Sequence, residues 1–133
     1  MPNDASQPLA WLMRAKGSLA RAEAGRFAPE ILYEDLCFDA QQAAEKALKA
    51  LLLAHQLPFA KTHDIGLLLQ RLANAGMAIP PQVQAADVLS FYAVVTRYPG
   101  DYPELTQAEY EEALGLARQV VAWVDQELQA QGG

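Results

Sequence analysis

An apolar pattern of helical period between Pro29 and His55 constrains the fold more than any other feature of the chain. Apolar side chains recur there at three- and four-residue steps, at Leu32, Leu36, Ala40, Ala43, Ala44, Ala47, Leu48 and Leu51. The opposite stripe is polar and holds Glu34, Asp35, Asp39, Gln42, Glu45, Lys46 and Lys49. The alanines let a neighbouring backbone approach closely, and the apolar arc extends onto Cys37, Phe38, Leu52 and Leu53. The pattern predicts the central helix of a bundle, with an arc wide enough to serve a dimer as well.

Four further segments have helical patterns or helix boundary signals. They run from about Pro8 to Gly25, Thr62 to Ala75, Pro81 to Arg97 and Thr106 to Gln129, with Thr62 as a cap and Gly25 and Gly76 as stops. Phe91 to Tyr98 is rich in β-branched and aromatic residues, so a strand is an alternative there, although no partner strand is visible. Short links between amphipathic helices predict an all-α, up-and-down antiparallel bundle of about five helices. We expect one domain over residues 8–128, with flexible termini at 1–7 and 129–133.

Charge and composition narrow the classes of function. The net charge is −6 over 133 residues, and the second half carries the excess, since residues 72–133 hold eight acidic groups and only Arg97 and Arg118 as bases. A general binder of phosphate backbones would be basic instead, so any nucleotide or RNA must be held by a local basic pocket. No long apolar run or signal peptide is visible, which predicts a cytoplasmic protein without a membrane span.

Metal and cofactor chemistry have no support in the sequence. No HExxH, CxxC, glycine-rich phosphate loop or EF-hand is present. The lone Cys37 lies inside a helical pattern and is expected to be a small buried hydrophobe. We therefore expect no metal and no cofactor.

Arg97 is the strongest candidate for a binding residue. It is the one charge between Asp87 and Asp101, and it ends an apolar run. A planar guanidinium suits a phosphate. The alternative is an ion pair with Asp87, which shares a helical face with Ser90 and Arg97, or with an acid of the last helix.

Other polar and aromatic residues are weaker candidates. Tyr98 and Tyr102 flank a Pro-Gly turn and could stack on a base, or simply pack. His63 follows a cap and precedes an acid, so it could orient a loop. His55 ends a helix, where a cation is favourable to the dipole.

Two segments together resemble the HEPN domain, the nucleotide-binding helical domain of prokaryotes and higher eukaryotes. The first is Tyr33 to Leu53 with its Gln-x-x-Glu-Lys-x-x-Lys spacing (Gln42, Glu45, Lys46, Lys49), followed by Lys61-Thr-His-Asp64. The second is Thr96-Arg-Tyr-Pro99, which is similar to the family's signature after its fourth helix. The likeness covers about residues 8 to 126.

The resemblance implies a helical bundle that commonly dimerises around a cleft, in a family with many ribonucleases and many toxins paired with a nucleotidyltransferase. Family ribonucleases have an arginine followed after four to six residues by a histidine. Here Arg97 matches, but Tyr102, Pro103 and Glu104 occupy the histidine positions. A tyrosine, with a pKa of about 10, is a poor proton-transfer group near neutrality.

These features predict a catalytically degenerate HEPN-like domain that binds nucleotide or RNA as a homodimer beside a nucleotidyltransferase, as in a toxin–antitoxin system. Arg97 would contact phosphate and Tyr98 or Tyr102 a base or sugar, with Lys46 and Lys49 as helpers. One alternative is a divergent metal-independent ribonuclease toxin that uses His63 or Tyr102 for proton transfer. Another is an assembly scaffold in which Arg97 only closes an ion pair.

Overall fold

The computed structural model describes residues 7–59, 61–94 and 103–132, and every regular element in these ranges is a helix. The α-helices are α1 (Pro8–Glu23), α2 (Tyr33–Ala54), α3 (Ile65–Asn74), α4 (Pro81–Gln84), α5 (Ser90–Val94) and α6 (Gln107–Gly132), and the 3-10 helix η1 (Ala85–Leu89) joins α4 to α5. The prediction of an all-α helical bundle is confirmed.

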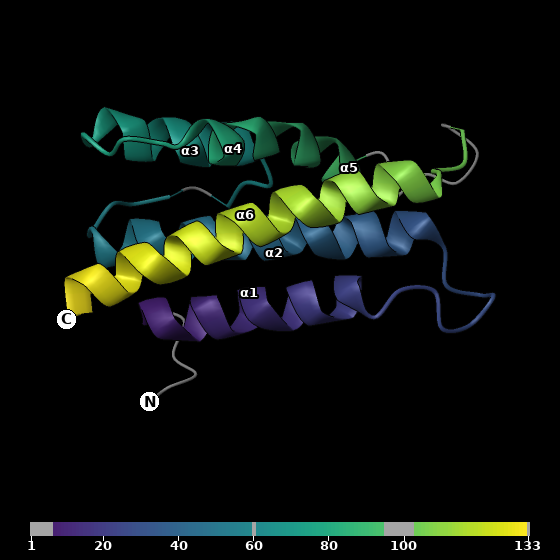
Figure 1. Cartoon of the computed structure of the whole chain (residues 1–133). Coiled ribbons are helices and arrows are strands. Elements are labelled where there is room, and N and C mark those ends of the chain that lie inside the picture. Colours follow the sequence, from purple (N-terminus) through teal and green to yellow (C-terminus); the bar gives the residue numbers. More distant parts are fainter. Residues whose placement is uncertain (1–6, 60, 95–102, 133) are drawn as a thin grey trace.

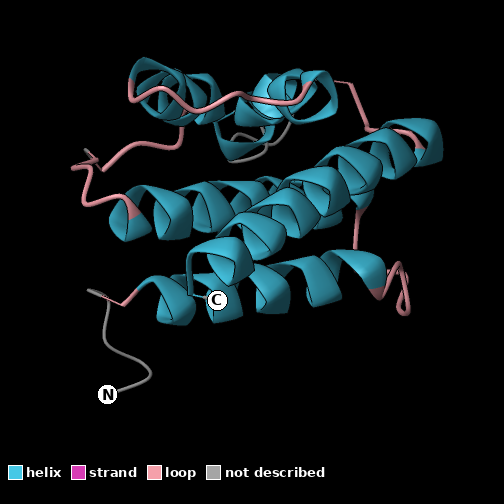
Figure 2. Cartoon of the chain, turned by 60° about the vertical axis from the view of Figure 1, so that its left-hand side comes forward, coloured by secondary structure: helices cyan, strands magenta, loops and turns pink. Residues whose placement is uncertain are grey.

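The helices lie in three tiers, with α2 and α6 in the middle (Figure 1). On one side α1 runs antiparallel to α2, and on the other side α3, α4 and α5 cover α2 and α6. The same order is visible after rotation (Figure 2). Because α2 packs against α1, α3, α5 and α6, its predicted place as the central helix is confirmed.

The core is built around α2. Its Leu48, Leu51 and Leu52 are fully buried, and they pack with apolar residues of the neighbouring helices, among them Ala15, Ala22, Ile65, Leu68, Leu72, Leu89, Ala117, Val120 and Val124. The outer part of the apolar arc is enclosed too, since Cys37 and Leu52 are both 0 % exposed. Phe38 and Leu53, the other two residues of this part of the arc, are half-buried, and the dimer surface suggested for this helix stays a prediction.

The connection from α2 to α3 turns back along α2. Gln56 has a left-handed backbone (φ 57°), and Leu57 donates its amide to the carbonyl of Leu52, which reverses the chain. This return segment (residues 57–59 and 61–64) then runs beside α2 before α3 begins (Figure 1). It brings Phe59 close to Lys49 and His63 close to Glu45, both in the middle of α2.

Several predicted boundaries need correction. Helix α2 begins at Tyr33 rather than near Pro29, and the cap of α3 is Asp64, whose carboxylate accepts from the amide of Leu67, rather than Thr62. The single helix predicted over 81–97 is three short pieces in its described part. The strand alternative is wrong for residues 91–94, which are helical, and residues 95–98 lie outside the described ranges.

Other boundaries follow the sequence. Gly25 and Gly76 have φ values of 74° and 98°, the left-handed backbone expected of helix stops. At the start of α6, Thr106 and Glu109 form a reciprocal capping box, since each side chain accepts from the other's amide. The end of α6 differs from the prediction, because the helix continues to Gly132 rather than ending near Gln129.

Candidate functional site

Two residues of the polar stripe of α2, Glu45 and Lys49, are buried, whereas Asp35 is exposed and the other members, Glu34, Asp39, Gln42 and Lys46, are half-buried. Glu45 and Lys49 are 4 % and 6 % exposed, and Gln41 is fully buried. One side of the stripe is covered by α1 and the other by the return segment, as the contacts below show. Charged side chains are seldom enclosed in this way unless they are paired.

Four donors converge on the Glu45 carboxylate, and the longest of these contacts is from Gln42 Nε2, at 3.5 Å from Oε1. Lys49 Nζ lies 2.9 Å from Oε2 and forms an i,i+4 ion pair with Glu45, and Gln41 Nε2 donates to Oε1 at 3.0 Å. His63 Nδ1 lies 2.8 Å from the same Oε1. Burial would raise the pKa of Glu45, but the hydrogen bonds from Gln41, Lys49 and His63 outweigh it and hold that pKa below its ordinary value. The group is therefore a carboxylate around neutral pH.

The His63 imidazole contacts Glu45 through Nδ1, and about half of its side chain is exposed to solvent. Its side chain is 49 % exposed while that of Glu45 is 5 % exposed. The His63 carbonyl also accepts a hydrogen bond from Gln41 Nε2 at 3.1 Å. Both the ring and the backbone of this residue are thus fixed by α2.

Lys49 points into the molecule. Its ammonium lies 5.7 Å from the ring centre of Trp11 and 5.4 Å from that of Phe59, which contact each other edge to face. With Glu45 as its ion partner, this cation is already satisfied. Of the two lysines predicted to help with phosphate, Lys46 is the better placed.

Lys46 belongs to a cluster of cations between α1 and α2. Its Nζ donates to Ser18 Oγ at 3.0 Å, and Arg21 reaches the same hydroxyl at 3.3 Å. Asp39 lies 3.4 Å from Arg21 as a counter-charge. Burial lowers the pKa of Lys46, and so do the positive charge of Arg21 and, more weakly, that of Arg14. The carboxylates of Glu45 and Asp39 raise this pKa, each by less than Arg21 lowers it. Cations outnumber carboxylates at this point, so the cluster favours an anion.

The other predicted site residues lie outside the described ranges. Arg97, Tyr98 and Tyr102 fall within residues 95–102, so their contacts and the proposed Asp87 ion pair stay predictions. Ser90, which shares that predicted face, accepts a hydrogen bond from the amide of Ile65 at 2.8 Å.

Sequence reasoning missed Ser18 and Gln41 as members of the site. Ser18 is fully buried and yet accepts from two cations. Gln41 precedes Glu45 by one helical turn, as Glu45 precedes Lys49, so a Gln-x-x-x-Glu-x-x-x-Lys series at four-residue steps was the available signal.

Neither a metal site nor a membrane-spanning helix is found among the described residues. No group of three or more His, Cys, Asp or Glu side chains in these ranges could hold a metal ion. None of the helices in the described part of the chain is both long and apolar enough to span a membrane.

Comparison with known proteins agrees with this architecture. The crystal structure of TT1696 from Thermus thermophilus superposes with a TM-score of 0.78 at 35% identity, covering 95% of this chain and 98% of that one. ST0689, an archaeal HEPN homologue, gives a TM-score of 0.71 at 26% identity, covering 91% of this chain and 97% of that one. No protein of curated function matches. A family model described as the HEPN domain matches residues 9–128, and the chain therefore belongs to the HEPN domain family.

Proposed function

We propose that this HEPN domain binds the phosphate groups of a nucleotide or RNA without cleaving them. The observation that carries the proposal is the convergence of Lys46 and Arg21 on the buried hydroxyl of Ser18. Two cations directed at one neutral oxygen leave positive charge that an anion can neutralise. In a chain of net charge −6, such a local excess is the feature that phosphate binding requires.

Arg97 is the second phosphate contact in this proposal, with Tyr98 or Tyr102 on the base or sugar. Helix α5 packs against α2 and ends at Val94, three residues before Arg97. The tyrosine at the family's histidine position supports binding rather than cleavage.

Titration of ATP and GTP against purified variants tests this function. Lys46→Ala and Arg97→Ala should each weaken binding by roughly tenfold or more, the loss of one charge-assisted hydrogen bond. Arg118→Ala is the matched control, because it removes one exposed cation of α6 that pairs with Glu23. Equal affinity of wild type, Lys46→Ala and Arg97→Ala, or no binding by wild type, would exclude the proposal.

We further propose that the domain acts in the cytoplasm as a homodimer beside a nucleotidyltransferase, in a toxin–antitoxin-like system. The support for the dimer is a row of exposed apolar side chains at three-residue steps, Val88, Phe91 and Val94, which are 55%, 50% and 60% exposed. A second copy of the chain that covers this row would remove its apolar surface from water.

Sedimentation of two charge-introducing variants tests the dimer. Phe91→Glu should convert a dimer to a monomer, because a carboxylate would be buried at the interface. Met13→Glu, on the exposed face of α1 at 62% exposure, should leave the dimer intact. A monomeric wild type, or a dimeric Phe91→Glu, would contradict this arrangement. Co-purification with the product of a neighbouring nucleotidyltransferase gene tests the partner.

A further inference from the structure

We propose that His63 binds a phosphate group of the ligand through its Nε2 atom, and that Glu45 is the residue that positions the imidazole for this role. The inference rests on the proposed phosphate-binding function and adds a further phosphate contact to it. Residues of α2 and of the return segment form this contact site together.

The hydrogen bond to Glu45 determines which ring nitrogen of His63 is available. An ionised carboxylate only accepts hydrogen bonds, so Nδ1, at 2.8 Å from Glu45 Oε1, must carry a proton. The remaining nitrogen, Nε2, belongs to a ring whose side chain is 49 % exposed. A carboxylate that fixes one nitrogen in this way orients the imidazole.

The ring is also held rigidly before any ligand arrives. Glu45 cannot swing away easily, because Lys49 Nζ holds its other oxygen at 2.9 Å. Gln41 Nε2 donates both to Glu45 Oε1 and to the His63 carbonyl, at 3.0 and 3.1 Å. A preorganised donor costs less conformational entropy on binding than a free surface histidine.

The local charges favour an anion at the open edge of the ring. Lys49 already neutralises Glu45 in a buried pair, so a protonated His63 adds one net positive charge at the surface. Its neighbours in the return segment, Lys61 and Asp64, are both exposed and of opposite sign. In the doubly protonated ring Nε2 also carries a hydrogen, and this N–H donor matches an oxyanion of a phosphate ester in both charge and hydrogen-bonding capacity.

The position of His63 also fits the cation cluster around Lys46. Lys46 follows Glu45 directly in α2 and reaches toward α1, where it meets Ser18. His63 meets Glu45 from the return segment. Lys46 and Glu45, the residue that holds His63, are therefore consecutive in α2, with Lys46 on the side of α1 and His63 on the side of the return segment.

Nuclear magnetic resonance of the imidazole rings tests the positioning role of Glu45. The chain has two histidines, so His55→Gln assigns the signals. At a pH where the ring is neutral, His63 should be the Nδ1–H tautomer in wild type and should lose that preference in Glu45→Gln/Lys49→Met. This double variant avoids leaving a lone buried ammonium, and its thermal melting verifies that it folds. An Nε2–H tautomer in wild type would overturn the role of Glu45.

Binding of ATP, at a pH where the ring is protonated, tests the ligand contact. His63→Ala should weaken binding by roughly tenfold, and His55→Gln, which alters the other histidine, should not. If wild type and His63→Ala bind ATP equally while Lys46→Ala binds weakly, only the His63 contact is refuted. If wild type does not bind ATP, the proposed function fails with it. Cleavage of an RNA oligonucleotide that disappears in His63→Ala would assign the residue to proton transfer and overturn a purely binding role.

Discussion

At the scale of single residues, Glu45 keeps its charge at 4 % exposure because donors from two separate segments surround its carboxylate. Gln41 and Lys49 lie one turn before and one turn after it in α2. His63 arrives from the return segment. The first two could be read from four-residue spacing in the sequence. The third could not, because no local pattern says which part of α2 the loop will meet.

We predict that Glu45 makes the protein sensitive to acid. Its pKa in the folded protein lies below the ordinary value of 4.5, so the unfolded chain takes up a proton first as the pH falls. The stabilisation from Glu45 is therefore complete above about pH 4.5 and is lost as the pH falls toward the folded pKa. Urea unfolding at a series of pH values measures this. Glu45→Gln/Lys49→Met should show a flatter decline than wild type below that pH, and parallel curves would contradict the prediction.

At the scale of elements, the start of α3 shows where sequence patterns succeed and fail. The patterns place a short helix here and a left-handed stop at Gly76, where φ is 98°, because apolar period and glycine are local signals. They assign the cap to Thr62, whereas Asp64 supplies it. They also miss that Ser90 accepts from the Ile65 amide, since that contact exists only once the helix predicted over 81–97 is broken and packed on α3.

Removing the Ser90 hydroxyl should destabilise the fold through α3. Ser90→Ala leaves the Ile65 amide without its 2.8 Å partner and should lower the free energy of unfolding by about 1 kcal/mol. Asp64→Ala should have an effect of similar size, about 1 kcal/mol, through loss of the cap. Gln82→Ala, an exposed substitution in α4, is the control. Urea unfolding measures all three, and a Ser90→Ala value equal to the control would contradict the proposed link between these elements.

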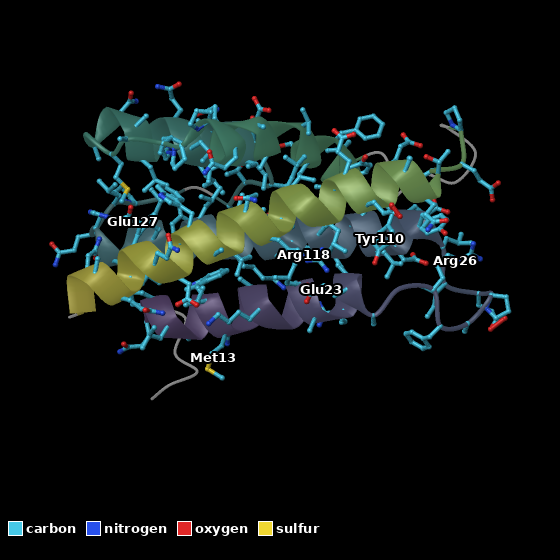
Figure 3. The ribbon with its side chains drawn as sticks, viewed as in Figure 1. Met13, Glu23, Arg26, Tyr110, Arg118 and Glu127 are labelled. Atoms are coloured by element: carbon cyan, nitrogen blue, oxygen red, sulfur yellow. The ribbon has the colours of Figure 1, made fainter. Side chains whose placement is uncertain are left out.

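At the scale of the whole molecule, Tyr110 joins the start of α6 to the end of α1. Its hydroxyl donates to the carbonyl of Ala22 at 2.6 Å, one of the last carbonyls of α1 and thus without a partner inside that helix. Its ring stacks on Tyr33 at 5.5 Å. Figure 3 shows Tyr110 and Arg118 on α6 along the side that faces α1, with Glu23 near the end of α1. The Arg118–Glu23 pair, at 2.7 Å, is solvent-exposed and contributes little.

Tyr110→Phe separates the hydrogen bond from the ring packing. We expect a loss of about 1 kcal/mol, equivalent to a fall in Tm of roughly 3–5 °C for a domain of this size. Arg118→Ala should change Tm by less, because that pair is screened by water. Differential scanning calorimetry measures both. A larger fall for Arg118→Ala than for Tyr110→Phe would show that the ion pair, rather than the tyrosine, joins α6 to α1.

The sequence by itself determined the helical class, the central place of α2 and the stops at Gly25 and Gly76, because period and backbone preference are properties of neighbouring residues. Only the tertiary structure decided that Glu45 and Lys49 of the polar stripe are buried and that His63 contacts Glu45. The physical reason is the return of the chain after Gln56, which lays the return segment along α2 and turns surface charges into a buried, hydrogen-bonded site.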